Sequence, residues 1–151
     1  MEISILFLPL IASIISGFFG KYIGDRNSEI VTSALVSISA LLSVFVLYQV
    51  IVNQYEENIV IATWINSGSL DVNWSMLIDP LSAVMLVVVT SVSSLVHIYS
   101  IGYMSHDPHK PRFMAYLSLF TFAMLMLVTS DNFIQLFFGW EGVGLCSYFL
   151  I

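Results

Sequence analysis

The chain has 151 residues, of which 58% are hydrophobic and only 9% are charged, and its mean hydropathy is +0.94. Soluble domains carry about 25% charged residues, so this composition identifies an integral membrane protein. The formal net charge is −6, but the acidic residues are scattered and no basic stripe exists, which excludes a nucleic-acid-binding protein.

The first apolar run covers residues 3–19 and has two possible interpretations. A secretory signal carries positive charge before its apolar core, whereas here Glu2 precedes the run and Lys21 and Arg26 follow it. We therefore predict a retained transmembrane helix. Pro9 lies inside this helix, and we expect a neighbouring helix to compensate for the hydrogen bond that the proline removes.

The next part of the chain changes its pattern twice. After a short predicted loop at residues 20–29, a second span is predicted over residues 30–52, which contain no charge. Residues 59–65 are then rich in β-branched and aromatic side chains, residues 66–69 have turn composition, and residues 70–76 alternate apolar with polar. This pattern predicts a β-hairpin outside the bilayer, lying on other surface elements because an isolated hairpin is only marginally stable.

Three further spans follow the hairpin. Asp79 is placed to cap a third span over residues 80–101, and a fourth span is predicted over residues 113–129. A short polar connection around Asp131 offers a cap to a fifth helix over residues 133–151. The predicted fold is an all-α integral membrane protein of about five transmembrane helices, with a short β-hairpin in the outer loop between helices 2 and 3.

The basic residues indicate how the chain is oriented. If the spans alternate, all four fall on one side of the membrane, namely Lys21, Arg26, Lys110 and Arg112. The positive-inside rule makes that side the inner one and leaves the N-terminus outside. We expect a multi-pass protein of the bacterial plasma membrane in preference to the mitochondrial inner membrane.

The fifth predicted helix contains one charged residue, Glu141, near the middle of an otherwise apolar run. An acid at that depth costs roughly 2.5 to 3.5 kcal/mol on insertion scales, and a membrane-buried acid is by default a functional hypothesis. On a helical projection Glu141 shares a face with Phe137, Gly144, Leu145 and Tyr148. The opposite face holds mostly small residues, which permit close helix packing, and consists of Gln135, Gly139, Gly142, Val143 and Cys146.

These two faces lead us to expect protein on both sides of the fifth helix, with Glu141 directed at an interior pathway. Two roles are open to this acid: it exchanges a proton or binds a cation, or it is a protonated residue that serves packing alone. The chain contains no basic residue inside a predicted span, so a positively charged partner for Glu141 must come from elsewhere.

Other residues that could carry chemistry give weaker signals. His97, near the inner end of the third span, is either structural or a proton relay. His106 and His109 lie in a polar loop, which argues against haem ligation. The glycines of residues 139–144 follow no strand, so we reject a nucleotide-binding loop. Cys146 is the single cysteine, and no Cys/His set has metal-ligand spacing, so we expect no metal site in this chain.

Three stretches, residues 64–85, 93–113 and 116–151, carry a family signature that includes Gly-Trp-Glu-Gly. They resemble the N-terminal part of the antiporter-like subunit L, or chain 5, of the proton-pumping NADH:quinone oxidoreductase, complex I. The resemblance implies that Glu141 is a proton-channel acid coupled to a lysine on a later, broken helix. It also implies that NADH, FMN, the iron–sulfur clusters and the quinone bind partner subunits, with no redox site in this chain.

The same resemblance implies a domain organisation. Residues 1–76 form an N-terminal two-helix segment with the outer hairpin, residues 77–112 the third helix and the inner loop, and residues 113–151 the start of an antiporter-like repeat. Members of the family are longer, so we expect the chain to be a fragment or a truncated product. Its expected partners are the lipid bilayer and other membrane subunits of complex I, especially a neighbouring antiporter-like subunit.

Two other functions remain open. A subunit of a multisubunit Na⁺/H⁺ antiporter shares the signature around the fifth helix, and a non-transporting structural or assembly piece needs no ion at all. Among ions, we favour H⁺ over Na⁺, because the fifth helix offers few other oxygen ligands near Glu141.

Overall fold

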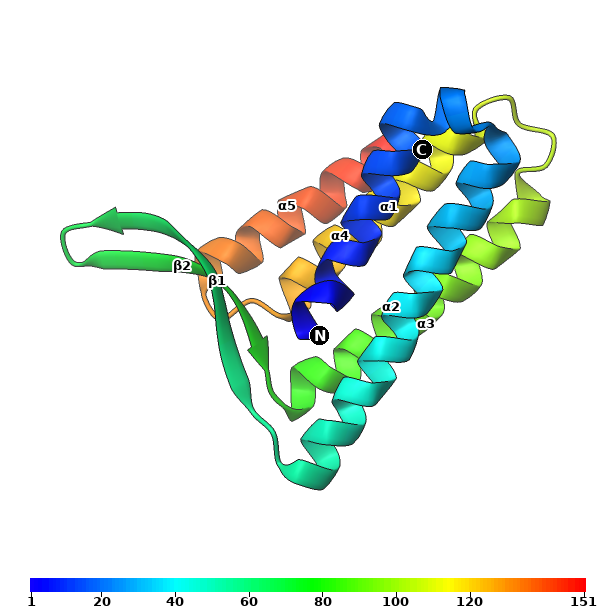
Figure 1. Ribbon diagram of the computed structural model, residues 1–151. Coiled ribbons are helices and arrows are strands. Elements are labelled where there is room, and N and C mark those ends of the chain that lie inside the picture. The colour runs from blue at the N-terminus through cyan, green and yellow to red at the C-terminus, as the bar shows by residue number, and fades with distance from the viewer.

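The computed structural model describes residues 1–151, and its helices run up and down in an antiparallel bundle (Figure 1). The helices are α1 (Glu2–Ile23), α2 (Asp25–Asn53), α3 (Pro80–Tyr103), α4 (Lys110–Val128) and α5 (Phe133–Leu150). Each of the five is long and apolar enough to cross a membrane. Between α2 and α3 lies an antiparallel hairpin of β1 (Glu57–Ser67) and β2 (Leu70–Ile78). The predicted fold class is therefore confirmed.

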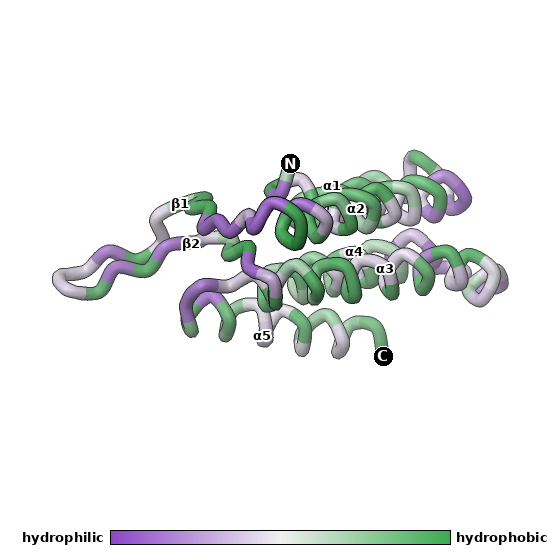
Figure 2. Tube along the Cα trace, turned by 90° about the horizontal axis from the view of Figure 1, so that it is seen from below, coloured by the Kyte–Doolittle hydropathy of each residue, from purple (hydrophilic) through white to green (hydrophobic).

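The helices form three layers, with α1 and α2 in the first, α3 and α4 in the second and α5 alone in the third (Figure 2). The α1–α2 and α3–α4 connections lie at one end of the bundle, which we call the basic end because it carries Lys21, Arg26, Lys110 and Arg112. The hairpin and the α4–α5 connection lie at the other end, the hairpin end. This segregation matches the sequence prediction.

Hydroxyl groups join the helices inside the bundle. Ser37 and Ser94 connect α2 to α3 at 2.7 Å between their Oγ atoms, and Ser43 and Thr90 do so at 2.7 Å nearer the hairpin end. Interhelical hydrogen bonds of this kind hold membrane bundles together, because apolar side chains gain little by moving from lipid to protein. Large apolar side chains accordingly cover the lipid-facing surface, while serines and threonines lie buried.

The proline in α1 is accommodated by α2, as predicted. Pro9 has no N–H, so the carbonyl of Ile5 receives no hydrogen bond from it. The buried hydroxyl of Ser39 in α2 donates to that carbonyl oxygen at 2.8 Å. A helix with an internal proline thus keeps its backbone acceptor paired.

The hairpin closes through a two-residue turn of Gly68 and Ser69, with Ser67 paired to Leu70. Gly68 has φ +62°, a left-handed conformation that glycine adopts without strain. The register shifts twice along β1, which leaves Ile61 and Trp64 without cross-strand partners. Such bulges bend a strand, and the hairpin here bends past the start of α5 so that its turn points away from the helices (Figure 1).

Two predicted boundaries are wrong. Residues 20–29 are almost entirely helical, because only Gly24, with φ +87°, separates α1 from α2. A glycine in the left-handed region can end one helix in a single residue, so no longer loop is needed. The fourth helix begins at Lys110 instead of residue 113, with Pro111 in its first turn, where a proline is tolerated.

Candidate functional site

Helix α5 is held against α4 through its small residues. A Cβ atom on Gly139 would lie 2.8 Å from the Leu127 backbone nitrogen, and one on Gly142 would lie 3.1 Å from Ala123 Cβ. Cys146, on the same face, is buried. The predicted packing face is therefore confirmed, because a larger residue at position 139 would collide with the α4 backbone.

The start of α5 is also bound to the hairpin. Gln135 is fully buried; its Oε1 accepts from the Ser75 N–H at 3.0 Å and its Nε2 donates to the Ser75 carbonyl at 2.7 Å. Two neighbouring positions on the same edge of β2 are also paired, since the Asn73 carbonyl accepts from Asn132 Nδ2 and the Leu77 N–H donates to the Thr129 carbonyl. The outer edge of β2 is thus covered by the α4–α5 connection and α5, as expected of a hairpin that needs support.

An aromatic cluster completes this contact. Phe138 of α5 packs against Trp74 and Trp64, with ring centroids 5.0 and 5.7 Å away, and the two tryptophans are 5.3 Å apart. Trp74 Nε1 donates to the Met126 sulfur of α4 at 3.4 Å. These contacts with the hairpin therefore fix the direction of α5 where the helix starts, at the hairpin end.

Glu141 lies on the uncovered face of α5. Its side chain is exposed and has no hydrogen bond or ion pair, and a Cβ on Gly144 would meet nothing within 4 Å. Leu145 and Tyr148 on this face are 56% and 75% exposed. We expected protein against both faces of α5, but only the small-residue face is covered. This chain therefore supplies no partner for Glu141.

His97 is buried in the bundle, on α3. Its Nδ1 lies 2.7 Å from the Ser93 carbonyl oxygen and its Nε2 lies 3.0 Å from the Ser118 hydroxyl of α4. This arrangement suits the neutral ring, with Nδ1–H donating to the carbonyl and Nε2 accepting from the hydroxyl. No hydrogen bond connects His97 to Glu141, so the structure does not bring these two candidate residues together.

The two aspartates predicted as helix caps differ. Asp79 forms a reciprocal capping box with Ser82, in which each side chain accepts from the other residue's backbone N–H, at 2.6 and 2.8 Å. This prediction is confirmed. The third helix consequently starts at Pro80, as predicted.

Asp131 is not a cap, so that prediction is wrong. The cap of α5 is Asn132, whose side chain accepts from the Gln135 N–H at 2.8 Å. Asp131 instead accepts from Asn58 of the hairpin at 2.9 Å. Desolvation works to raise the pKa of this carboxyl, but the hydrogen bonds donated by Asn58 and Asn132 outweigh it and lower the pKa from its ordinary value.

One buried acid, Glu29, falls in the loop predicted at residues 20–29. It lies instead in the second turn of α2, is only 5% exposed, and its Oε1 has no hydrogen-bond partner. The sequence carries a signal for this, because polar residues recur with helical spacing along the next turns of α2, at 29, 32, 33, 37, 39 and 43. Burial of that stripe makes α2 helical from its first turn.

No cation of this chain lies near the middle of a helix. The four basic residues are gathered at the basic end, where Lys110 opens α4 and Arg112 donates to the Tyr116 hydroxyl at 3.3 Å. No group of three or more His, Cys, Asp or Glu side chains comes together in a way that could hold a metal ion. Glu141 is therefore the one charged side chain that lies near the middle of a helix.

Comparison with known proteins agrees with these features. Residues 64–114 match the family described as NADH-Ubiquinone oxidoreductase (complex I), chain 5 N-terminus. All 151 residues align with NADH-ubiquinone oxidoreductase chain 5 of Arabidopsis thaliana at 56% identity, and 149 align with that of Phytophthora infestans at 54%. The protein of the same description from Dictyostelium discoideum is 48% identical over the whole chain.

The relatives are much longer than this chain. The alignment covers all of this chain and 23% of the Arabidopsis thaliana protein, and 99% of this chain and 22% of the Phytophthora infestans protein. The family model that matches this chain describes the N-terminal part of chain 5. These relatives are eukaryotic, so they give no support to the predicted preference for a bacterial membrane.

Proposed function

Because the chain belongs to the chain 5 family of NADH-ubiquinone oxidoreductase (complex I), we propose that it acts in the proton-translocating membrane subunit of that enzyme. In this role it couples electron transfer from NADH to quinone, carried out in other subunits, to proton movement across the membrane. NADH, FMN, the iron–sulfur clusters and the quinone bind those other subunits. The neighbouring membrane subunits, especially an antiporter-like one, are its partners.

Glu141 is the observation that carries the proposal. It is the one charged residue of α5, it lies in the middle of the helix, and its side chain points away from the rest of the chain. A carboxylate in a low-dielectric setting takes up a proton, whereas a cation brought beside it favours the ionised form and releases the proton. Movement of a positive side chain toward and away from Glu141 therefore gives one cycle of proton release and uptake.

The partner of Glu141 belongs to a helix outside this chain. The resemblance implies a lysine there, and the open face of α5 leaves room for such a helix beside Phe137 and Leu145. In this proposal α4 and α5 are the first helices of the antiporter-like repeat, and the small-residue face holds α5 on α4 while the Glu141 face does the transport.

The proposed ion is H⁺. Sodium requires several oxygen ligands around one site, but the face of α5 that carries Glu141 is lined mainly by Phe137, Gly144 and Leu145. A proton needs only the carboxylate and one partner at a time. This face therefore suits proton transfer better than sodium binding.

The proposed location is the mitochondrial inner membrane, with the basic end facing the matrix and the N-terminus outside. The eukaryotic relatives favour this membrane, and the gathering of the basic residues at one end favours this orientation. The hairpin then lies on the outer surface.

We assign His97 a structural role in joining α3 to α4. Both of its ring nitrogens already have partners inside the bundle, at Ser93 and Ser118. A relay role would require one of these hydrogen bonds to exchange during turnover. Replacement of His97 by Gln should therefore weaken the bundle more than it changes the number of protons moved per electron.

The test is Glu141→Gln in the full-length subunit, assembled in the complex and reconstituted into vesicles. We expect fewer protons pumped per NADH oxidised, because glutamine cannot take up a proton. Glu56→Gln, which neutralises an exposed acid outside the helices, is the matched control and should pump normally. A proton-to-NADH ratio that Glu141→Gln leaves unchanged would reject the transport role and favour a purely structural one.

A further inference from the structure

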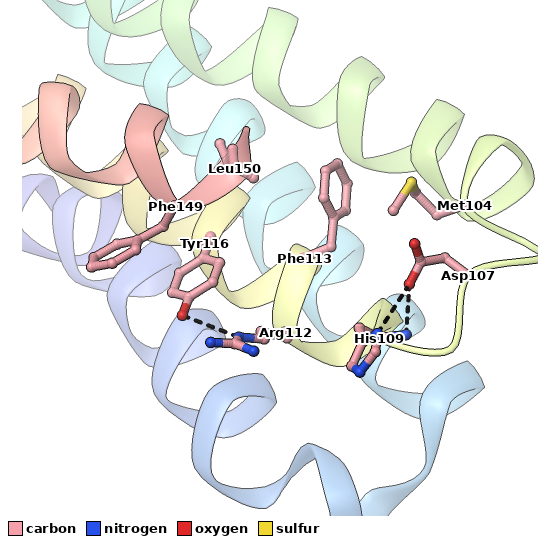
Figure 3. A pocket seen from close by; sticks show the side chains of 8 residues that line it. All are labelled: Met104, Asp107, His109, Arg112, Phe113, Tyr116, Phe149 and Leu150. Atoms are coloured by element: carbon pink, nitrogen blue, oxygen red, sulfur yellow. Dashed lines mark hydrogen bonds and ion pairs between the residues drawn. The ribbon is translucent and has the colours of Figure 1, made fainter.

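Two adjoining pockets open at the basic end of the bundle. The basic pocket, of about 630 Å³, lies between α1 and the start of α4 and is lined by Lys21, His109 and Arg112, among others. The second pocket, of about 400 Å³, lies between the start of α4 and the last turn of α5 (Figure 3). Phe113, Phe149 and Leu150 form its apolar wall, and Asp107 lines it as well. His109, Arg112 and Tyr116 line both, so the two pockets lie on either side of these side chains.

The cations of the basic pocket are free to bind an anion. The ion pairs of this structure join Met1 to Glu2 and His109 to Asp107, so neither Lys21 nor Arg112 is paired with an acid. Arg112 uses only Nε, toward the Tyr116 hydroxyl, which leaves its terminal nitrogens available (Figure 3). A guanidinium with free terminal nitrogens is well suited to phosphate oxygens.

Two acidic groups also line these pockets. Asp25 lines the basic pocket from the first turn of α2, where the helix dipole favours a negative charge. Lys21 and Arg112 outweigh Asp25 there by one formal positive charge. Asp107 lines the second pocket, where it accepts from the His109 N–H at 2.6 Å.

The pockets lie at the depth where lipid headgroups meet the hydrocarbon. Lys21 is in the last turn of α1 and Arg112 in the first turn of α4. Exposed tyrosines surround this end of the bundle, as is usual at membrane interfaces, namely Tyr22, Tyr99, Tyr103 and Tyr148. A soluble anion would use the cations alone, whereas the adjoining apolar wall also offers contact to a hydrocarbon chain.

We propose that the two pockets bind one anionic phospholipid, with its phosphate between Lys21 and Arg112 and one acyl chain along Phe113 and Phe149. Basic pockets between transmembrane helices on the positive side of a protein are suited to such headgroups. The Tyr116 ring, which stacks on Phe149 with centroids 5.2 Å apart, separates the polar part of the site from the apolar part.

The test is native mass spectrometry of the intact membrane protein in neutral detergent, titrated with phosphatidylglycerol or with phosphatidylcholine. We expect retention of one phosphatidylglycerol and weaker retention of phosphatidylcholine. Lys21→Gln and Arg112→Gln should each weaken phosphatidylglycerol binding by about fivefold, and the double variant by about 25-fold. Both residues lie at the surface, and unchanged thermal unfolding would verify that the variants remain folded.

The matched control is the double variant Arg26→Gln with Lys110→Gln. It removes the same charge from the same end of the bundle, but neither residue lines either pocket. This control should keep binding within about twofold, because general attraction to anionic lipid is small compared with a defined site. An equal loss of binding in both double variants would overturn the site.

Two further outcomes would overturn the lipid as occupant. Displacement of phosphatidylglycerol by millimolar inorganic phosphate would assign the cations to a soluble anion. Lipid binding that the Lys21/Arg112 double variant leaves unchanged, together with loss of a neighbouring subunit on purification, would assign the pockets to a protein contact.

Discussion

Gln135 of α5 pairs with the main chain of Ser75 in β2 as another strand would, through one accepted and one donated hydrogen bond. Ser75 lies at the outer edge of a two-stranded sheet, where its backbone groups have no third strand to bind. One buried side chain thus joins the hairpin to the helix that carries Glu141.

We expect Gln135→Leu to destabilise the protein by about 2 to 4 kcal/mol, because it leaves the buried N–H and C=O of Ser75 unpaired. Gln49→Leu is the control, since Gln49 is half-buried on α2 and makes no hydrogen bond. Thermal unfolding in detergent measures the difference, and proteolysis at the hairpin turn should become faster in the first variant only. Equal stability of the two variants would show that Gln135 does not anchor the hairpin.

Ser39→Ala should cost about 1 to 2 kcal/mol, because the Ile5 carbonyl freed by Pro9 loses the hydrogen bond from the Ser39 hydroxyl. In a Pro9→Ala background the alanine N–H can donate to that carbonyl, so Ser39→Ala should then cost less. The four proteins form a double-mutant cycle, measured by unfolding in detergent. Additive effects would contradict the compensation of Pro9 by Ser39.

Gly139→Ala should weaken the α4–α5 contact by about 1 to 3 kcal/mol, because the new methyl group must push aside the Leu127 backbone. Gly144→Ala, on the open face, meets nothing within 4 Å and should be neutral or stabilising by up to about 1 kcal/mol through helix propensity. Thermal unfolding of both variants tests this, and a reversed order of stability would mean that α5 packs on α4 through another face.

Asp131 should make stability depend on pH. Its pKa is lower in the folded protein, so the stability it contributes is fully present above its unfolded value of about 3.9 and is lost as pH falls through the folded pKa. The difference in melting temperature between the wild type and Asp131→Asn should therefore be largest near neutral pH and shrink below about pH 4.

The control for loss of one charge is Asp71→Asn in β2, whose side chain is exposed and makes no hydrogen bond. If the difference in melting temperature between the wild type and Asp131→Asn is the same at every pH, titration of Asp131 is not its cause.

The features that could be predicted from the sequence are those that follow from local pattern. Five long apolar runs, the alternation on either side of Gly68 and the Asp79–Pro80 signal each determine a structure within a few residues, and all three predictions are confirmed. The small-residue face of α5 was predictable for the same reason, since helical periodicity brings Gly139 and Gly142 together.

The wrong predictions depended on tertiary contacts that pattern does not contain. Glu29 was placed in a loop because a charge near a span usually marks a solvated end, yet α2 buries it against its neighbours. Asp131 was expected to cap α5, but hydrogen bonding with Asn58 of the distant hairpin holds it, and Asn132 takes the cap. The surroundings of Glu141 could not be predicted from local sequence pattern either, because they depend on which elements cover α5.

The two attachments of α5 also affect later assembly. Helix α5 is held along one face by α4 and at its start by the hairpin, so its direction is set before anything covers the Glu141 face. A helix that docks on that face meets a rigid, preorganised surface. If the proposed partner helix docks there, most of the entropic cost of association falls on its own side chains, because Glu141 is already in place.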